Sequence, residues 1–133
     1  MPRVTFSVQG GNQAVAAKFT RKGSAAREAA VRFTNDHGLA HYDALYAETP
    51  LRKGRMRRLL RLESTRAGLG YRTGFLAADW EAEGQYPYFY VVLFGNLAGT
   101  IVGDDYMSPI NRQYEARYRT GLPAAIRAAT RRA

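Results

Sequence analysis

The sequence predicts an α+β domain in which an antiparallel sheet is flanked by a long N-terminal helix and a C-terminal helix. Apolar residues follow the helical period over residues 25–47, and after Gly54 the pattern changes to one typical of strands. The 133 residues, 46% of them hydrophobic, suit a single domain over 1–133. Because the sequence contains no cysteine, disulfides, thiolate metal sites and a cysteine nucleophile are excluded.

The first third of the sequence is predicted to form one strand and two helices. Apolar side chains alternate within residues 3–8, which is typical of a half-buried strand. A short helix is expected over residues 12–19. The long helix is expected to begin with Ser24 as its N-cap, because a serine oxygen accepts hydrogen bonds from first-turn amides. It should end before Pro50.

The middle of the sequence is predicted to form a pair of antiparallel strands. Residues 56–62 and 71–77 are expected to be these strands, joined by a glycine-containing bend at residues 67–70. A polar turn is expected at residues 81–85. The apolar run 86–94 fits either a buried strand or a short core helix, and its periodicity does not decide between them.

The last third is predicted to contain a long loop followed by helices. Residues 96–108 include two glycines, and a loop of this length suggests a functional role. Pro109 is expected to open a helix that runs to about Gly121, and Pro123 is expected to start a second helical stretch.

Charge is arranged in blocks along the sequence. The net charge is +9, with +7 in residues 52–72, +5 in residues 112–133 and −5 in residues 79–105. Arginine supplies 17 of the 20 positive charges, which suits bidentate pairing with carboxylates or phosphates and is also typical of a GC-rich genome. Such blocks indicate either a basic surface for nucleic acid or identical subunits that join an acidic face to a basic one.

The sequence contains no motif that predicts catalysis or a bound cofactor. His37 and His41 have a spacing compatible with a shared metal, but the glutamate that accompanies such a pair in zinc proteases is absent. Asp104 and Asp105 suit a solvated loop or a subunit contact better than a magnesium or acid-base site. We therefore expect a protein that is not an enzyme and binds neither metal nor cofactor.

Aromatic residues are concentrated between Trp80 and Phe94. Beside a basic groove, such side chains would stack on the bases of single-stranded nucleic acid. The surrounding block is acidic, however, and Val91, Val92 and Leu93 are typical core residues. A packed core with tyrosine hydroxyls at its edge is therefore the favoured interpretation.

Two short motifs and their order resemble those of a known family. The long predicted helix is followed by Thr49-Pro50-Leu51-Arg52-Lys53-Gly54-Arg55-Met56-Arg57, and the predicted strand pair by Phe89-Tyr90-Val91-Val92-Leu93-Phe94-Gly95-Asn96. Ser108-Pro109-Ile110 then leads into the last helix. This order is similar to that of the phage neck and tail-completion (head–tail joining) proteins grouped as HK97 gp10-like. Lys53 and Leu93 stand where that family usually has Thr and Glu.

The resemblance implies a structural role in a virion. Members of the family have tail-terminator-like folds, with a twisted antiparallel sheet flanked by helices. They assemble in the host cytoplasm into rings, often hexamers, that join the head connector to the tail tube and let DNA pass through the lumen. The implied partners are further copies of this chain, other neck or connector proteins, the tail-tube protein and genomic DNA that passes through the lumen non-specifically, with no membrane.

A ring of identical subunits needs two different and complementary faces on each subunit. Under this hypothesis, the acidic block of one copy contacts the basic block of a neighbouring copy or ring. The expected interface residues are Arg55, Arg57, Arg58, Arg61, Asp79, Glu81, Glu83, Asp104 and Asp105. In the loop, the residues expected to dock on an adjacent neck or tail-tube ring are Asn96, Gly99, Gly103 and Tyr106.

Two other classes of function remain open from the sequence. A small basic nucleic-acid-binding domain would contact phosphates through segments 52–72 and 112–132, and its affinity for DNA would fall steeply with salt. A small enzyme would need a concave site where titratable groups converge, and the sequence places none.

Overall fold

The computed structural model describes residues 4–8, 23–50, 54–96 and 98–132, and the fold is of the predicted α+β class. The elements are β1 (Val4–Val8), α2 (Ser24–Glu48), α3 (Arg55–Leu59), β2 (Arg61–Thr65), the 3₁₀ turn η2 (Arg66–Gly68), β3 (Gly70–Phe75), α4 (Ala77–Ala82), α5 (Phe89–Phe94) and α6 (Met107–Arg132). The helix predicted over residues 12–19 lies outside the described residues.

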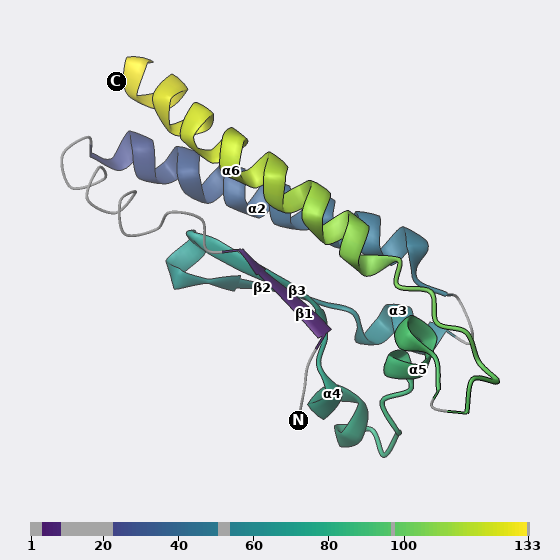
Figure 1. The fold of residues 1–133 in the computed structure, drawn as a ribbon. Coiled ribbons are helices and arrows are strands. Elements are labelled where there is room, and N and C mark those ends of the chain that lie inside the picture. The colour runs from purple at the N-terminus through teal and green to yellow at the C-terminus, as the bar shows by residue number, and fades with distance from the viewer. Residues whose placement is uncertain (1–3, 9–22, 51–53, 97, 133) are drawn as a thin grey trace.

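The three strands form one antiparallel sheet in the order β1-β3-β2, with β3 in the centre. Helix α2 packs on β3 and β2, and α6 runs beside α2 along nearly its whole length (Figure 1). The short helices α3, α4 and α5 gather at one end of the molecule, together with the loop that leads into α6 (Figure 1). The predicted long helix, strand pair and C-terminal helix are therefore present.

The strand pair β2–β3 is confirmed, but its first strand begins later than predicted. Residues 55–59 form helix α3, so the prediction of a strand from residue 56 is wrong for this part. Met56 and Leu59 are both buried, and a spacing of three brings two side chains to the same side in a helix but to opposite sides in a strand. Gly54 precedes α3 with φ of 72°, a conformation that glycine adopts without strain.

Helix α2 approaches its neighbours closely because most of its buried residues are small. These residues are Ala26, Ala30, Thr34, Gly38, His41 and Leu45. A Cβ atom on Gly38 would lie 3.0 Å from the ring of Tyr71 on β3, so glycine permits this contact. The helix ends before Pro50 as predicted, but its N-cap is Gly23, and the prediction of Ser24 as a capping side chain is wrong.

Helix α6 is one continuous helix and not the two predicted stretches. Pro123 lies inside it and lacks the amide hydrogen that would bond to the preceding turn. Leu122 and Ile126 on either side of the proline are buried against α2, whereas Pro123 itself faces solvent. Tertiary packing of the buried face therefore keeps the helix continuous across a residue that would end an isolated helix.

Residues 77–94 contain more helix than the sequence predicts. The segment expected as a polar turn at 81–85 begins as the end of α4, because Ala77 and Trp80 are buried three residues apart. Within the undecided run 86–94, residues 89–94 form the helix α5. Trp80 and Phe89 are fully buried, as the packed-core interpretation requires, whereas Tyr86 and Phe94 are exposed.

Two groups of buried residues lie under the helices. The group at the end with the short helices contains Leu45, Met56, Leu59, Leu60, Phe75, Ala77, Trp80, Phe89, Leu93 and Met107. The second group, between the two long helices and β3, contains Ala26, Ala30, Tyr71, Tyr118, Leu122 and Ile126. The first group contains Met56 and Leu59 of α3 and, at the two ends of the loop before α6, Leu93 and Met107, so it holds this loop and the basic helix α3 at the same end of the fold.

Candidate interaction surface

The predicted interface charges lie on α3, β2 and α4, directly after α4, and in the loop before α6. Several of them pair within one chain. Arg58 Nη1 lies 2.7 Å from Glu83 Oε1, and Arg61 Nε lies 3.4 Å from Asp79 Oδ2. Arg61 also contacts Glu63, at 3.3 Å. These pairs are solvent-exposed and each contributes about 0–1 kcal/mol to stability. The sequence blocks of opposite charge thus meet partly inside the subunit.

Arg55 and Arg57 differ from their neighbours, because neither forms an ion pair within the described part of the chain. Arg55 donates from Nη1 to Gln85 Oε1 at 3.0 Å. Arg57 donates from Nε to the carbonyl of Thr49 at 3.0 Å, and its guanidinium carbon lies 5.0 Å from the ring centre of Tyr46. Arg57 is therefore a cation held in one orientation by neutral groups, with its charge uncompensated.

The three remaining acidic residues of the predicted interface have different roles. Asp105 caps the start of α6, where its side chain accepts hydrogen bonds from the amide and hydroxyl of Ser108 at 3.1 and 2.6 Å. Asp104 and Glu81 are exposed, and neither makes an ion pair with a described residue. Asp104 is thus an available anion beside a carboxylate that already has a structural role.

The loop between α5 and α6 is closed by its own backbone. Asp104 N donates to Val92 O at 2.9 Å, and Asn96 N donates to Ile101 O at 3.2 Å. A Cβ atom on Gly103 would clash with the backbone of Phe94, so the two ends of the loop approach closely only because residue 103 is glycine. The loop therefore has a defined shape.

Hydrogen bonds of the predicted docking residues shape this loop and anchor its end. The Asn96 side chain accepts from the amide of Ile101 at 3.1 Å and donates to the Thr100 hydroxyl at 2.8 Å. Gly99 N donates to Asn96 O at 3.2 Å. The hydroxyl of Tyr106 lies 3.0 Å from that of Thr49, which ties the loop to the end of α2. These residues support the loop, whereas apolar side chains that the sequence interpretation did not single out form its outer surface.

Besides Leu62 on β2 and Tyr86 before α5, the exposed large apolar side chains of the described residues fall into two groups that the sequence did not reveal. Beside and within the loop, Phe94 is 59%, Ile101 48% and Val102 89% exposed. On α2, Leu39 is 52% and Tyr46 39% exposed. Single exposed apolar residues are normal, but groups of them mark interaction sites.

Two histidines considered as metal ligands lie in a packed polar cluster between α2, β3 and α6. His41 is fully buried; its Nδ1 lies 2.8 Å from the Tyr71 hydroxyl and its Nε2 lies 2.7 Å from Asn111 Oδ1. His37 Nε2 donates to the Tyr114 carbonyl at 2.7 Å. No three His, Cys, Asp or Glu side chains in the described ranges gather as a metal site would require.

Burial sets the titration of this cluster. Burial lowers the pKa of His41 to about 4, opposed by the hydrogen bond to Asn111 and assisted by the charge of His37. Burial also lowers the pKa of His37. It raises the pKa of Tyr71 and Tyr118, so both hydroxyls stay protonated near neutral pH. The cluster is neutral at pH 7 and acts as a hydrogen-bonded part of the core.

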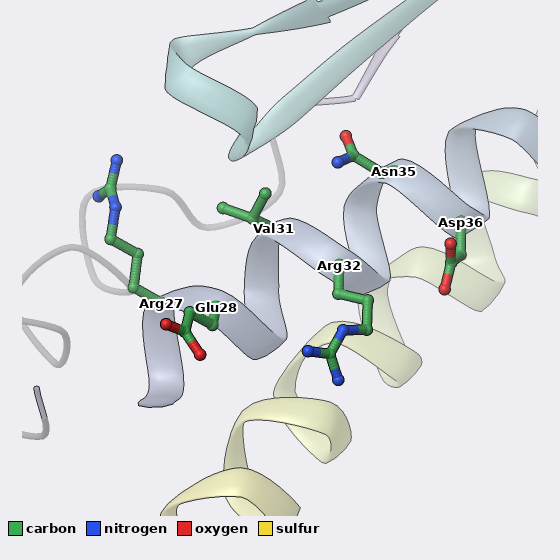
Figure 2. A pocket seen from close by; sticks show the side chains of 6 residues that line it. All are labelled: Arg27, Glu28, Val31, Arg32, Asn35 and Asp36. Atoms are coloured by element: carbon green, nitrogen blue, oxygen red, sulfur yellow. The ribbon is translucent and has the colours of Figure 1, made fainter. Parts of the chain in front are cut away.

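A hollow of about 430 Å³ lies on the surface of α2, near the turn between β2 and β3 (Figure 2). The side chains that line it are Arg27, Glu28, Val31, Arg32, Asn35 and Asp36. They follow one another along a single helix, and the labelled charged groups of Arg27 and Asp36 lie at opposite ends of the view (Figure 2). Convergent catalytic groups are not brought together in this hollow.

Comparisons with known proteins identify no relative: no protein-family model matches the chain, and no curated protein or solved structure shows significant similarity to it. Within the described ranges, no helix has both the length and the apolar character needed to span a bilayer.

Proposed function

We propose that this chain is a structural protein of a tailed-phage neck, in which copies of it form a ring between the head connector and the tail tube. The observation that carries the proposal is the surface at the loop end of the fold, where Phe94, Ile101 and Val102 are exposed around a closed loop. An apolar centre beside charged residues is typical of a protein interface. The order of motifs described above assigns this interface to head–tail joining.

The arrangement of charges supports the same proposal. Among the residues that the structure describes, Arg57 is held without an acidic partner, and Asp104 is exposed without a basic one. Opposite charges left uncompensated on different elements suit a contact between non-identical surfaces. Head-to-tail contacts of this kind close into rings when the rotation between subunits permits it.

The test is a measurement of mass in solution combined with an image of the phage particle that contains the protein. The proposal predicts a ring at the junction of head and tail, and particles lacking the chain should accumulate unjoined heads and tails. Solitary molecules both in solution and in the particle would refute it. A reaction catalysed by the purified chain would refute it as well.

A second candidate, binding to nucleic acid, is favoured by one specific feature of α6. Its exposed arginines include Arg112, Arg117, Arg127 and Arg131, besides Arg119, which pairs with Glu115, and no acidic residue occurs after Glu115. Arginines along a helix suit contact with phosphates. This candidate predicts a selective complex between a monomer and DNA whose affinity falls steeply with salt, whereas a ring needs no selective monomer complex.

A further inference from the structure

We propose that, within the ring, the loop of one copy packs on helix α2 of the next copy. The loop patch consists of Phe94, Ile101 and Val102, with Asp104 beside it. The helix patch consists of Leu39, Tyr42 and Tyr46 on α2, with Arg57 against it. This inference rests on the proposed ring function and adds which surfaces meet.

The loop patch is presented on a fixed backbone. Glycine at position 103 lets the two ends of the loop touch, and the Asn96 side chain bridges its tip through Thr100 and the amide of Ile101. Val102, next to that amide, is the most exposed of the large apolar side chains described. A preshaped loop loses little conformational entropy on binding, which favours its use as a docking element.

The helix patch is a continuous apolar stripe. Leu39, Tyr42 and Tyr46 are three and four residues apart, so they lie on one side of α2. The rings of Tyr42 and Tyr46 are 6.0 Å apart, and Tyr42 is partly buried against the core while Leu39 and Tyr46 face solvent. An aromatic residue that the core holds on one side, as it holds Tyr42, is typical of the centre of an interface.

Charge complementarity identifies a second copy of this chain as the partner. The guanidinium of Arg57 lies over Tyr46 at one end of the helix patch, and its Nε donates to the carbonyl of Thr49. Its terminal nitrogens form no ion pair with any residue that the structure describes. Asp104 follows the loop patch directly in sequence after Gly103 and is exposed. An apolar surface with an anion at its rim thus matches an apolar surface with a cation at its rim.

The two patches differ in residues and in charge, so the contact between them is heterologous. A heterologous contact leaves one loop patch and one helix patch free at the ends of any open chain of copies. When the ring closes, the free loop patch at one end binds the free helix patch at the other end. If a neighbouring ring of another protein bound the loop patch instead, the experiments below would give a different result.

Cysteine cross-linking tests the contact directly, because the sequence contains no cysteine. The double variant Leu39→Cys/Val102→Cys is assembled as the full chain and oxidised, with each single variant as a matched control. We expect a ladder of covalent oligomers that ends at the ring number in the double variant only. Dimers formed by Val102→Cys alone would mean that two loops meet, and this result would overturn the inference.

A charge exchange provides an independent measurement. Arg57→Glu and Asp104→Arg should each weaken self-association about tenfold or more, and mixing the two variants should restore association between them. Arg127→Glu, an exposed reversal outside both patches, is the control. Circular dichroism verifies that each variant is folded, and rescue by mixing cannot arise from unfolded chains.

The outcomes separate this inference from the proposed function. If the wild-type chain forms rings but the double cysteine variant gives no ladder within them, the contact is wrong and the ring proposal stands. If rings form with the Val102→Ser variant yet fail to join the tail, the loop docks on another ring and the inference is overturned. Solitary wild-type molecules in the particle refute both.

Discussion

His41 should make the stability of this fold depend on pH in a defined direction. Its ring is buried between α2, β3 and α6, and both ring nitrogens have partners: Nε2–H donates to Asn111 Oδ1, and Nδ1 accepts from the Tyr71 hydroxyl. Nδ1 can take up a proton only if the Tyr71 hydroxyl first breaks its hydrogen bond to the ring, because that hydroxyl now donates its own hydrogen to Nδ1. Burial, the largest cause, favours the neutral form of the histidine, and the hydrogen bond to Asn111 opposes it only in part.

The size of the effect follows from the difference in pKa between the two states. An unfolded histidine titrates near 6.5, whereas the folded one titrates near 4. Between these values the unfolded chain binds a proton that the folded chain does not, so the free energy of unfolding falls as the pH falls. The contribution of His41 is fully present above pH 6.5, and about 2 kcal/mol of it is lost by pH 5.

Urea unfolding at pH 7, 6 and 5, followed by the fluorescence of the single, buried Trp80, measures this loss. The His41→Gln variant keeps a donor and an acceptor but does not titrate. It should be less stable at pH 7 and should lose much less stability between pH 7 and 5 than the wild type. His37→Gln is the matched control and should remove a smaller part of the dependence. Equal pH dependence in the wild type and in His41→Gln would refute the reasoning.

Three further predictions concern the loop, the ion pairs and α6. Gly103→Ala should open the loop, speed amide exchange at residue 104 and weaken self-association, because a Cβ would clash with the loop's other end; unchanged exchange would contradict this. Arg58→Glu should change the unfolding free energy by less than about 1 kcal/mol and leave assembly intact, because its partner is Glu83 of the same chain; loss of rings would place Arg58 in the interface. Pro123→Ala should raise the unfolding free energy by about 1–2 kcal/mol in urea titrations, since alanine restores a helix hydrogen bond while the unfolded chain gains some freedom; a lower value would show that the proline is required.

The sequence predicted the elements whose signals are local. The apolar period of α2 and the proline after it defined one long helix, and alternation defined β3 and its pairing with β2. The prediction from the sequence failed where tertiary packing decides whether a short segment forms a helix, a strand or a turn. A single helical turn at α3 has too few residues to show a period, and α6 continues through Pro123 because its buried face is held by α2.

The candidate surface was predicted only in part. The position of the loop along the chain was predicted, since its glycines and paired acids are visible in a sequence, whereas its role as a contact surface stays a prediction. Which charges compensate one another depends on how α3 and α4 meet in the fold. Within the described ranges, this placement leaves Arg57 and Asp104 without ionic partners. The exposure of Val102 and Leu39 was equally hidden, because an apolar residue in a sequence gives no indication of whether it is covered.

The most direct test of the account is the arrangement of this chain in an intact particle, imaged at the junction between head and tail. We predict a closed collar of identical subunits in which residue 102 of each copy lies against residue 39 of the next. A particle in which the chain occurs as isolated copies, or does not occur at the junction at all, would contradict the account.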